Sequence, residues 1–196
     1  MVRSTNVVWQ QGLLDRAQRW DALGHPGATV WMTGLPASGK STVAGAVEAR
    51  LVGEGRPAYV LDGDNLRHGL NGDLGFSAEH RAENVRRTAE VSALLADAGV
   101  VVLVALVSPY RADRAAARAV HDRLELPFVE VHVATSLEEC ERRDPKGLYA
   151  RARAGELRHL TGVDDPYEPP DAPDVVVTGD EPLETAAERV LAALPR

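Results

Sequence analysis

The segment Gly34-Leu35-Pro36-Ala37-Ser38-Gly39-Lys40-Ser41 combines glycines with one lysine and serines in an order that suits phosphate chemistry. It matches the pattern G-x-x-x-x-G-K-[S/T]. Glycines let backbone N–H groups turn inward on phosphate oxygens, at a helix N-terminus whose dipole also favours anions. Lys40 can reach the β- and γ-phosphates of ATP, the Ser41 hydroxyl can ligate the bridging Mg²⁺, and Thr42 can assist from the same turn. The segment therefore predicts an ATP site that works with Mg²⁺.

A phosphate loop of this kind needs a strand before it and a helix after it. Residues 28–33 are rich in β-branched and aromatic types and predict the strand. Residues 41–52 predict the helix, because Val43, Val47 and Leu51 recur every four positions and share one face. Both elements are present, so phosphate binding explains the segment better than an ordinary glycine-rich turn does.

Two carboxylates and an arginine follow the next predicted strand, residues 58–61, in the order Asp62-Gly63-Asp64-Asn65-Leu66-Arg67. In open α/β sheets, ligands lie at the carboxyl ends of the strands. An acceptor hydroxyl needs a proton acceptor and the metal needs oxygen ligands, so we predict Asp62 as a catalytic and metal-ligating residue. The alternative is that Asp62 or Asp64 only caps a helix starting at Asn65.

Arginines recur around one aromatic and one amide side chain in the stretch that follows. They are Arg67, Arg81, Arg86 and Arg87, with Phe76 and Asn84 among them. Arginine forks bind phosphate or sulfate oxygens bidentately, and an aromatic face can stack on a base. Arg81 and Asn84 are three residues apart on a predicted helix and share a face. The pattern indicates an anionic nucleotide as acceptor, with a solvated helix face as the alternative for Arg86 and Arg87.

A second basic cluster opens a polar, irregular stretch at residues 144–174. Its members are Arg142, Arg143, Lys146, Arg151, Arg153 and Arg158. Long insertions in compact domains are often lids, and positive charge on a lid can cover transferring phosphates and exclude water. We expect a lid over residues 144–165, in which about half of the arginines are ordinary surface charges.

Apolar runs alternate with longer amphipathic segments along the chain, which indicates an α/β protein. Further strands are predicted at residues 100–107, 128–133 and 175–177, and further helices at 77–99, 111–124, 136–143 and 183–194. We expect a P-loop NTPase fold: a parallel sheet of five or slightly more strands, flanked by helices on both faces and carrying the lid. Residues 1–27 are predicted as an N-terminal extension and residues 28–196 as a single kinase domain.

The composition excludes several classes of protein. A net charge of −7 over 196 residues argues against a nucleic-acid polymer as partner, since the phosphate backbone rewards clustered positive charge. The longest apolar run, residues 100–107, is far shorter than the roughly 20 residues of a membrane helix. The lone Cys140 cannot form an intramolecular disulfide, and we find no secretory leader. We therefore expect a cytoplasmic protein with no membrane partner.

Nucleotide binding alone leaves three classes open: a small-molecule kinase, a GTPase-type switch, and a mechanical or scaffold NTPase module. A switch that reads guanine commonly carries Asn-Lys-x-Asp, and no such tetrapeptide occurs here. The acidic and basic residues of the acceptor side favour the kinase. A kinase for another nucleotide-linked anion and a non-catalytic regulatory module remain the alternatives.

Ordered motifs extend well beyond the phosphate loop. They are Leu61-Asp62-Gly63-Asp64-Asn65, Arg67-His68-Gly69-Leu70, Asp73-Leu74-Gly75-Phe76-Ser77, Ser108-Pro109-Tyr110-Arg111-Ala112-Asp113-Arg114 and Arg143-Asp144-Pro145-Lys146-Gly147-Leu148-Tyr149. In this order they resemble the adenylylsulfate kinase family, over residues 28–168. The resemblance implies transfer of the ATP γ-phosphate to the ribose 3′-hydroxyl of adenosine 5′-phosphosulfate (APS), giving 3′-phosphoadenosine 5′-phosphosulfate (PAPS) and ADP in sulfate assimilation.

The resemblance also implies site residues and partners. The implied APS contacts are Asp64, Asn65, Arg67, Phe76, Arg81, Asn84, Val107, Ser108, Lys146, Gly147, Leu148 and Leu160. Lys40, Asp62 and Ser108 are the implied catalytic residues, with Ser41 and Asp62 at the metal. ATP and APS are the expected small-molecule partners. We expect a homodimer and keep association with ATP sulfurylase as an open alternative.

Two positions depart from the family pattern or leave a role open. Many members have phenylalanine where Leu160 stands, closing an aromatic sandwich on adenine with the residue that matches Phe76, and leucine covers a base without a π face. Ser108 matches a serine often described as a phosphoserine intermediate. No base neighbours Ser108 in the sequence, and positioning plus charge stabilisation suffices for direct in-line transfer, so we assign Ser108 to the site without a fixed role.

Overall fold

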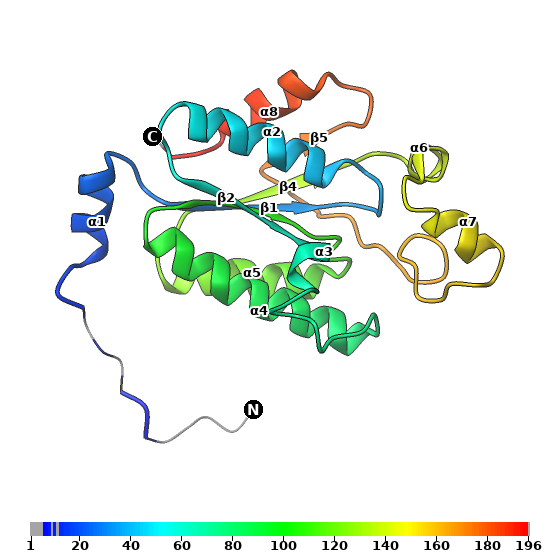
Figure 1. Ribbon diagram of the computed structural model, residues 1–196, viewed down its shortest axis with the longest axis horizontal. Helices are drawn as coiled ribbons and strands as arrows, with labels where there is room; N and C mark the ends of the chain where they lie inside the picture. The colour runs from blue at the N-terminus through cyan, green and yellow to red at the C-terminus, as the bar shows by residue number, and fades with distance from the viewer. Residues whose placement is uncertain (1–5, 9, 11, 196) are drawn as a thin grey trace.

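Five parallel strands form the centre of the molecule, in the spatial order β2-β3-β1-β4-β5 (Figure 1). The computed structural model describes residues 6–8, 10 and 12–195. The strands are β1 (Ala28–Thr33), β2 (Ala58–Asp62), β3 (Val101–Ala105), β4 (Phe128–Val133) and β5 (Val175–Val177). β1 pairs with β3 on one side and β4 on the other, and all of its residues are buried. The phosphate loop therefore leaves the sheet from its most buried strand.

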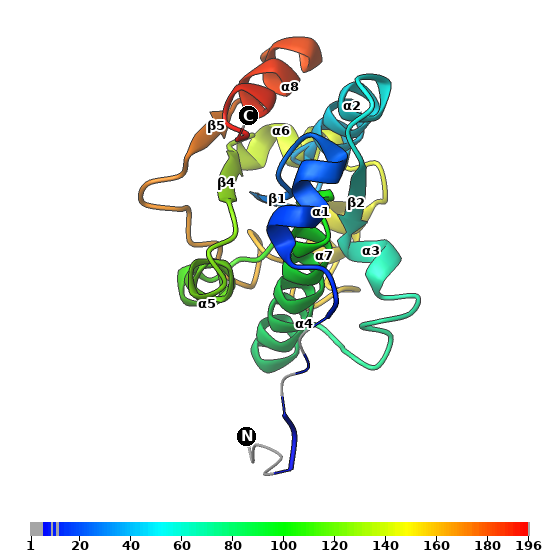
Figure 2. The same ribbon diagram turned by 90° about the vertical axis from the view of Figure 1, so that its left-hand side faces the viewer.

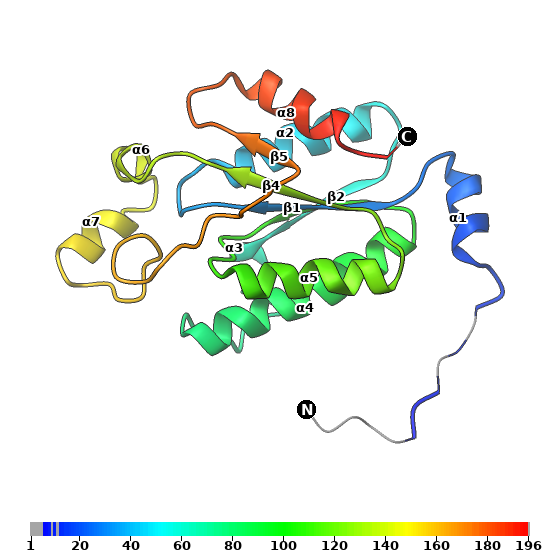
Figure 3. The ribbon, with the colours of Figure 1, turned by 180° about the vertical axis from the view of Figure 1, so that it is seen from behind.

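Helices cover both faces of this sheet (Figure 2). They are α1 (Arg16–Leu23), α2 (Lys40–Gly53), α3 (Gly63–Leu66), α4 (Ala78–Asp97), α5 (Arg111–Arg123), α6 (Leu137–Arg143), α7 (Leu148–Arg153) and α8 (Leu183–Ala192). α2 and α8 pack on one face, α4 and α5 on the other, and α6 with α7 lies beyond the carboxyl ends of the strands (Figures 1 and 3). The predicted α/β class and parallel sheet are confirmed.

Alternating strand residues supply two apolar cores. Val30, Met32 and Val131 point to the α2 and α8 side, where they pack with Val47. Trp31 points to the opposite side and packs in the layer that α4 and α5 cover. Successive side chains of a strand face opposite ways, so one run of apolar residues serves both layers. This two-sided packing fixes the strand ends that carry the site.

The N-terminal extension contains a helix that the sequence did not indicate. Asp15 caps α1 in a reciprocal capping box with Gln18. Arg16 and Arg19 form ion pairs with Asp97 at the end of α4. The Trp20 indole Nε1 donates to the Ala96 carbonyl at 3.3 Å, so α1 is packed on the body of the domain. None of its residues is fully buried, which explains why apolar periodicity missed it.

Most element boundaries differ from the predicted ones by one or two residues, and three differences bear on the site. β3 ends at Ala105, not at residue 107, because its pairing with β1 and β2 ends at this residue, and Ser108 then adopts a positive φ of 37°. α3 begins at Gly63, earlier than the expected start at Asn65. The stretch 144–174 is not irregular throughout, since it holds α7 and an apolar cluster in which Tyr149 and Leu160 are buried.

Within the described ranges, no helix has both the length and the apolar character needed to cross a membrane.

Candidate active site

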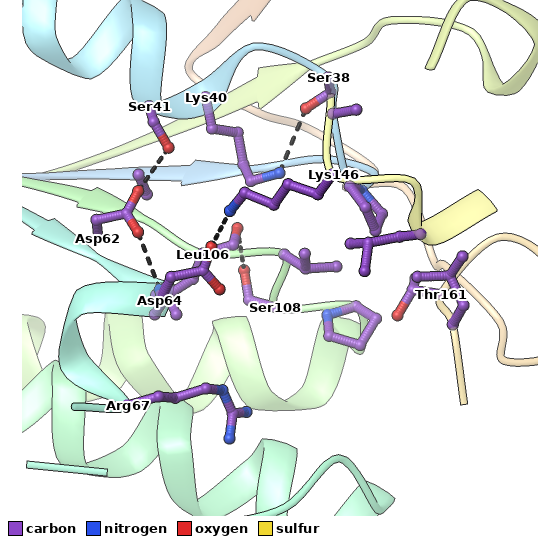
Figure 4. A pocket seen from close by; sticks show the side chains of 18 of the residues that line it. Ser38, Lys40, Ser41, Asp62, Asp64, Arg67, Leu106, Ser108, Lys146 and Thr161 are labelled. Atoms are coloured by element: carbon purple, nitrogen blue, oxygen red, sulfur yellow. Dashed lines mark hydrogen bonds and ion pairs between the residues drawn. The ribbon is translucent and has the colours of Figure 1, made fainter. Parts of the chain in front are cut away.

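One pocket of about 1180 Å³ opens at the carboxyl ends of the strands and joins the phosphate loop to the lid (Figure 4). Most predicted site residues line it. They are Pro36, Ala37, Ser38, Gly39, Lys40, Ser41, Thr42, Asp62, Asp64, Asn65, Arg67, Phe76, Arg81, Asn84, Val107, Ser108, Lys146, Leu148 and Leu160. The two sets of residues that the sequence assigned to nucleotide and acceptor therefore share a single cavity.

Gly34, Leu35 and Gly147 are predicted site residues that lie outside the pocket lining. A Cβ at Gly34 would stand 2.5 Å from the Val133 carbonyl oxygen, so this position needs glycine for close packing against β4. The Leu35 side chain packs into the apolar cluster of the lid. Gly147 precedes α7 with a φ of 65°, which makes it a turn residue of the lid. These three residues therefore shape the backbone and the packing around the pocket and do not line it.

The Lys40 side chain folds back along the phosphate loop. It is buried, and its ammonium donates to the carbonyl oxygens of Gly34 at 3.0 Å and Leu35 at 2.7 Å. Burial lowers the pKa of Lys40 to about 8. A phosphate anion beside this ammonium would favour its charged form, so nucleotide binding and protonation of Lys40 support each other.

Ser41 and Asp62 meet where the phosphate loop faces the end of β2. The Ser41 hydroxyl donates to Asp62 Oδ2 at 2.5 Å, and Asp62 Oδ1 accepts from the Asp64 backbone N–H at 2.9 Å (Figure 4). The same carboxylate thus caps α3 and contacts the serine of the phosphate loop, so the capping interpretation is confirmed for Asp62 and is compatible with the predicted site role. Hydroxyl and carboxylate oxygens are hard donors of the kind that Mg²⁺ prefers, and the pair fits such an ion.

Phe76 lies beside two arginines in the pocket. The guanidinium carbon of Arg67 lies 4.3 Å from the ring centroid and that of Arg81 lies 5.6 Å away. Phe76 is 55% exposed, an unusual state for a large aromatic side chain. The ring therefore offers its surface to a ligand while both cations stay close to it.

Backbone carbonyls hold these two arginines in place. Arg67 Nη1 donates to Leu74 at 2.7 Å and Gly75 at 3.1 Å. Arg81 Nε donates to Phe76 at 2.9 Å, and its Nη2 reaches the His159 carbonyl in the lid. Burial is the main cause that lowers the pKa of both side chains, since it disfavours the charged form. Two partly desolvated cations beside an aromatic face suit an anion attached to a base.

The lid contributes one cation and one apolar residue to the pocket. Lys146 forms an ion pair with Asp64, which links the lid to the segment after β2 (Figure 4). This hydrogen bond raises the pKa of Lys146. Leu160 is nearly buried and packs in the same cluster as Tyr149 while it borders the pocket. The Leu160 side chain therefore gives the pocket an apolar surface but no aromatic face.

Ser108 is held by groups that the sequence did not single out. The Trp31 indole Nε1 donates to Ser108 Oγ at 3.2 Å, and Ser108 Oγ lies 3.5 Å from the Leu106 carbonyl oxygen. Arg114, which is 3% exposed, donates to the Ser108 carbonyl at 2.7 Å. Arg114 belongs to the Ser108–Arg114 motif, so the residue was visible, but its role needed the fold to appear.

Other arginines divide into pocket and surface groups. Arg143 at the end of α6 lines the pocket together with Arg151 and Arg158 of the lid, and all three were named only as members of a basic cluster. Arg86 is exposed and pairs with Glu83, which supports the solvated-face alternative, whereas Arg87 is half-buried and also bonds Asp73 and the Leu70 carbonyl, so it ties α4 to the segment before it. Thr161, buried at the pocket wall, went unnoticed because a single threonine carries no sequence signal.

A phosphate loop at the end of a central parallel strand, a carboxylate beside its serine and a basic lid define a P-loop kinase of small molecules. The adenylylsulphate kinase family model matches residues 26–178. An adenylyl-sulfate kinase of Clostridium kluyveri is 51% identical over 177 residues, covering 90% of this chain and 87% of that protein. One of Geotalea uraniireducens is 52% identical over 172 residues, covering 88% and 82%.

A solved structure gives the same assignment. The APS kinase CysC of Mycobacterium tuberculosis in complex with AMPPNP and APS superposes with a TM-score of 0.84 at 55% identity, covering 86% of this chain and 97% of that one. The chain belongs to the adenylylsulphate kinase family. It is an ATP-dependent phosphotransferase with an alcohol group as acceptor, and the alternatives of a differently specific kinase or a non-catalytic module are not favoured.

Proposed function

We propose that the chain transfers the ATP γ-phosphate to the ribose 3′-hydroxyl of APS through the residues that line this pocket. The observation that carries the proposal is the continuity of one cavity from Lys40 and Ser41 to Arg67, Phe76 and Arg81. A cavity that holds both substrates can place the acceptor hydroxyl in line with the γ-phosphate, and such positioning supplies much of the catalysis in phosphoryl transfer.

The nucleotide triphosphate occupies the phosphate-loop end in this proposal. Backbone N–H groups of residues 37–41 surround its phosphates, and Lys40 leaves its two loop carbonyls to meet the β- and γ-phosphates. Arg143 lies close to the loop, since a Cβ on Gly39 would stand 3.8 Å from its Nη1. Arg143, the last residue of α6, is therefore the arginine that we assign to the charge developing on the transferred phosphate.

The acceptor occupies the other end. Phe76 and Leu160 cover the base, while Arg67 and Arg81 with Asn84 bind the phosphosulfate oxygens. Asp64, Asn65 and Lys146 border the space between the two ends, with Val107, Ser108 and Leu148 along its walls. The Asp62 carboxylate accepts the proton of the 3′-hydroxyl, directly or through water.

We assign Mg²⁺ to Ser41 and Asp62. The described residues contain no cluster of three or more histidine, cysteine or acidic side chains that could hold a metal by themselves. Mg²⁺ commonly keeps several waters and takes one or two protein oxygens together with substrate phosphates, which suits this pair. When bound, it neutralises charge on the β- and γ-phosphates.

Direct transfer is the route that the surroundings of Ser108 support. Its hydroxyl is engaged by Trp31 and Leu106, and these partners include no carboxylate or imidazole able to take its proton. A phosphoserine would also add charge at a position that is 4% exposed. Ser108 shapes the acceptor wall in this proposal.

The domain limits and assembly are part of the proposal. Residues 28–196 form the kinase domain with a lid over 144–165, and residues 1–27 form the extension that carries α1. Val7, Val8, Leu13 and Leu14 of the extension are exposed apolar side chains, which support a homodimer contact there. Sedimentation of the full chain tests the dimer, and co-elution with ATP sulfurylase tests that association. We place the activity in the cytoplasm.

Release of ADP in a coupled assay with Mg²⁺, ATP and APS tests the function. We expect turnover that depends on all three, with PAPS formed in a one-to-one ratio to ADP. Adenosine 5′-monophosphate and other nucleoside phosphosulfates serve as competing acceptors in the same assay. Turnover of another nucleotide in place of APS would exclude the acceptor assignment and leave the fold assignment intact.

A further inference from the structure

Asn71 and Asn84 form a buried pair of amides behind the acceptor end of the pocket. Asn71 Nδ2 donates to Asn84 Oδ1 at 2.8 Å. Asn71 is fully buried and Asn84 is 5% exposed, and of the two it is Asn84 that lines the pocket. The Asn71 side chain therefore reaches the site through Asn84.

The backbone around Asn71 is held on both sides. Its N–H donates to the Leu66 carbonyl at 2.8 Å, and its own carbonyl accepts from the Leu74 N–H at 3.1 Å. Arg67 then ties the next turn by donating to the Leu74 carbonyl at 2.7 Å. With its main chain fixed in this way, Asn71 presents its amide to Asn84 from a defined position.

An asparagine side chain has a carbonyl end that accepts hydrogen bonds and an NH₂ end that donates them. Because Asn84 Oδ1 accepts from Asn71, the NH₂ group of Asn84 is left for the pocket. Arg81 is three residues away on the same face of α4, and both side chains line the pocket. Both groups are donors, and together they suit a ligand group rich in lone pairs.

We propose that Asn71 is a positioning residue for the acceptor: it orients the Asn84 amide so that NH₂, and not the carbonyl, meets the anionic oxygens of APS. The inference rests on the proposed function, because it takes APS as the molecule bound there. The inference adds Asn71, a residue outside the pocket lining, which determines whether Asn84 turns its NH₂ group or its carbonyl towards the ligand.

The side-chain oxygen of Asn71 indicates a role beyond packing. Asn71 Oδ1 is buried and has no hydrogen-bond partner among the described residues. An unsatisfied buried carbonyl costs stability, and an apolar side chain of the same shape avoids that cost. An amide at this position is thus explained by what its NH₂ end does to Asn84.

Asn71→Asp, assayed at alkaline pH, tests the proposal, because an ionised carboxylate accepts hydrogen bonds and cannot donate one. The Asn84 amide then turns its NH₂ towards the carboxylate and its carbonyl towards the ligand. We expect the KM for APS to rise about tenfold or more, the size of a lost hydrogen bond to a charged group, with kcat and the KM for ATP within about twofold. An unchanged KM for APS would overturn the inference.

A pH profile and a second variant separate orientation from a structural effect. Burial raises the pKa of an introduced carboxyl group, so its protonated form should donate again and bring the KM for APS of Asn71→Asp back towards the original value near pH 6. If Asn71→Asp does not fold, Asn71→Leu takes its place. Leucine frees the Asn84 amide to rotate, and a smaller rise in the KM for APS is expected, whereas no rise contradicts the inference.

A double variant shows whether Asn71 acts through Asn84. In an Asn84→Ala background, Asn71→Asp should add nothing to the KM for APS, since the amide it acts on is gone. If the two substitutions instead raise the KM for APS by independent factors that multiply, the inference is overturned.

Ser92→Ala is the matched control, because Ser92 is fully buried on α4 and lies outside the pocket lining. Absence of APS turnover in the unmodified chain would reject the proposed function itself, a result distinct from an unaltered KM in the variant.

Discussion

The Ser41 hydroxyl donates to Asp62 Oδ2 at 2.5 Å across the gap between the phosphate loop and the end of β2. Asp62 has a second oxygen engaged with the Asp64 backbone N–H, so its position is fixed by α3. One carboxylate therefore couples the nucleotide end of the pocket to the acceptor end. Any variant of Asp62 changes both the fold of α3 and the site unless the cap is kept.

Asp62→Asn keeps the cap and removes the charge, because asparagine is as good an N-cap as aspartate. We expect kcat to fall about 10²–10⁴-fold, the usual contribution of a general base, with thermal stability nearly unchanged. Binding of ATP in the absence of metal should stay within a fewfold of the original, measured by isothermal calorimetry. Asp73→Asn, on the outer surface, is the control and should keep full turnover. Full activity of Asp62→Asn would remove Asp62 from the chemistry.

Ala37 occupies a left-handed backbone conformation in the phosphate loop, with a φ of 60°. Alanine pays a steric cost there that glycine avoids, although glycine also loses more entropy on folding. We expect Ala37→Gly to stabilise the chain by about 0.5–1 kcal/mol, which raises Tm by roughly 1–4 °C in a domain of this size. Scanning calorimetry measures the shift. Ala115→Gly, at an exposed position inside α5, should do the opposite and lower Tm.

Local sequence signals predicted the scaffold of the site well. β4 was predicted at its observed bounds, and α2 begins one residue before its predicted start. Glycine punctuation and apolar periodicity act over a few residues, so a single sequence contains them. Phe76 and Arg67 lie close together, as their predicted membership of one site requires, and their contact with a ligand stays a prediction.

Contacts between distant segments were beyond sequence reasoning. The bonds of Arg114 to the Ser108 and Glu168 carbonyls join α5, the turn after β3 and the segment after the lid. The ion pairs of Arg16 with Asp97 link residues 81 positions apart. An arginine in a charged stretch looks like a surface residue until the fold buries it, because its type alone does not indicate its partners.

His121 should make stability depend on pH on the acid side of neutrality. It is fully buried, with its ring nitrogens 2.9 Å from Thr29 Oγ1 and from the Ala117 carbonyl. Burial is the main cause that lowers its pKa below the ordinary 6.5. Below that value the unfolded chain binds a proton that the folded chain resists, so stability is lost as the pH falls from about 6.5 towards the folded pKa.

Urea unfolding at several pH values measures this effect. We expect the unfolding free energy to fall with decreasing pH with a slope of at most about 1.4 kcal/mol per unit from this one group. His121→Gln should be less stable at pH 8 yet show a shallower acid slope. His68→Gln, at an exposed position, is the control and should keep the original slope. Identical slopes for His121→Gln and the unmodified chain would assign the acid sensitivity to other groups.

Lys146 links the lid to Asp64, and both side chains are more than 60% exposed. An exposed ion pair contributes little to stability, so Lys146→Met should leave the unfolding free energy within about 0.5 kcal/mol of the original. The charge of Lys146 attracts the anionic acceptor, so the KM for APS of Lys146→Met should rise about tenfold.

Salt tests whether this effect of Lys146 is electrostatic. Because ions screen the attraction, added salt should raise the KM for APS in the unmodified chain more than in Lys146→Met. Steady-state kinetics across ionic strength measure this, with Arg142→Met as the control, since Arg142 is exposed on α6 and pairs with Glu139 away from the pocket. Equal salt dependence in all three proteins would show that Lys146 does not act on the acceptor through its charge.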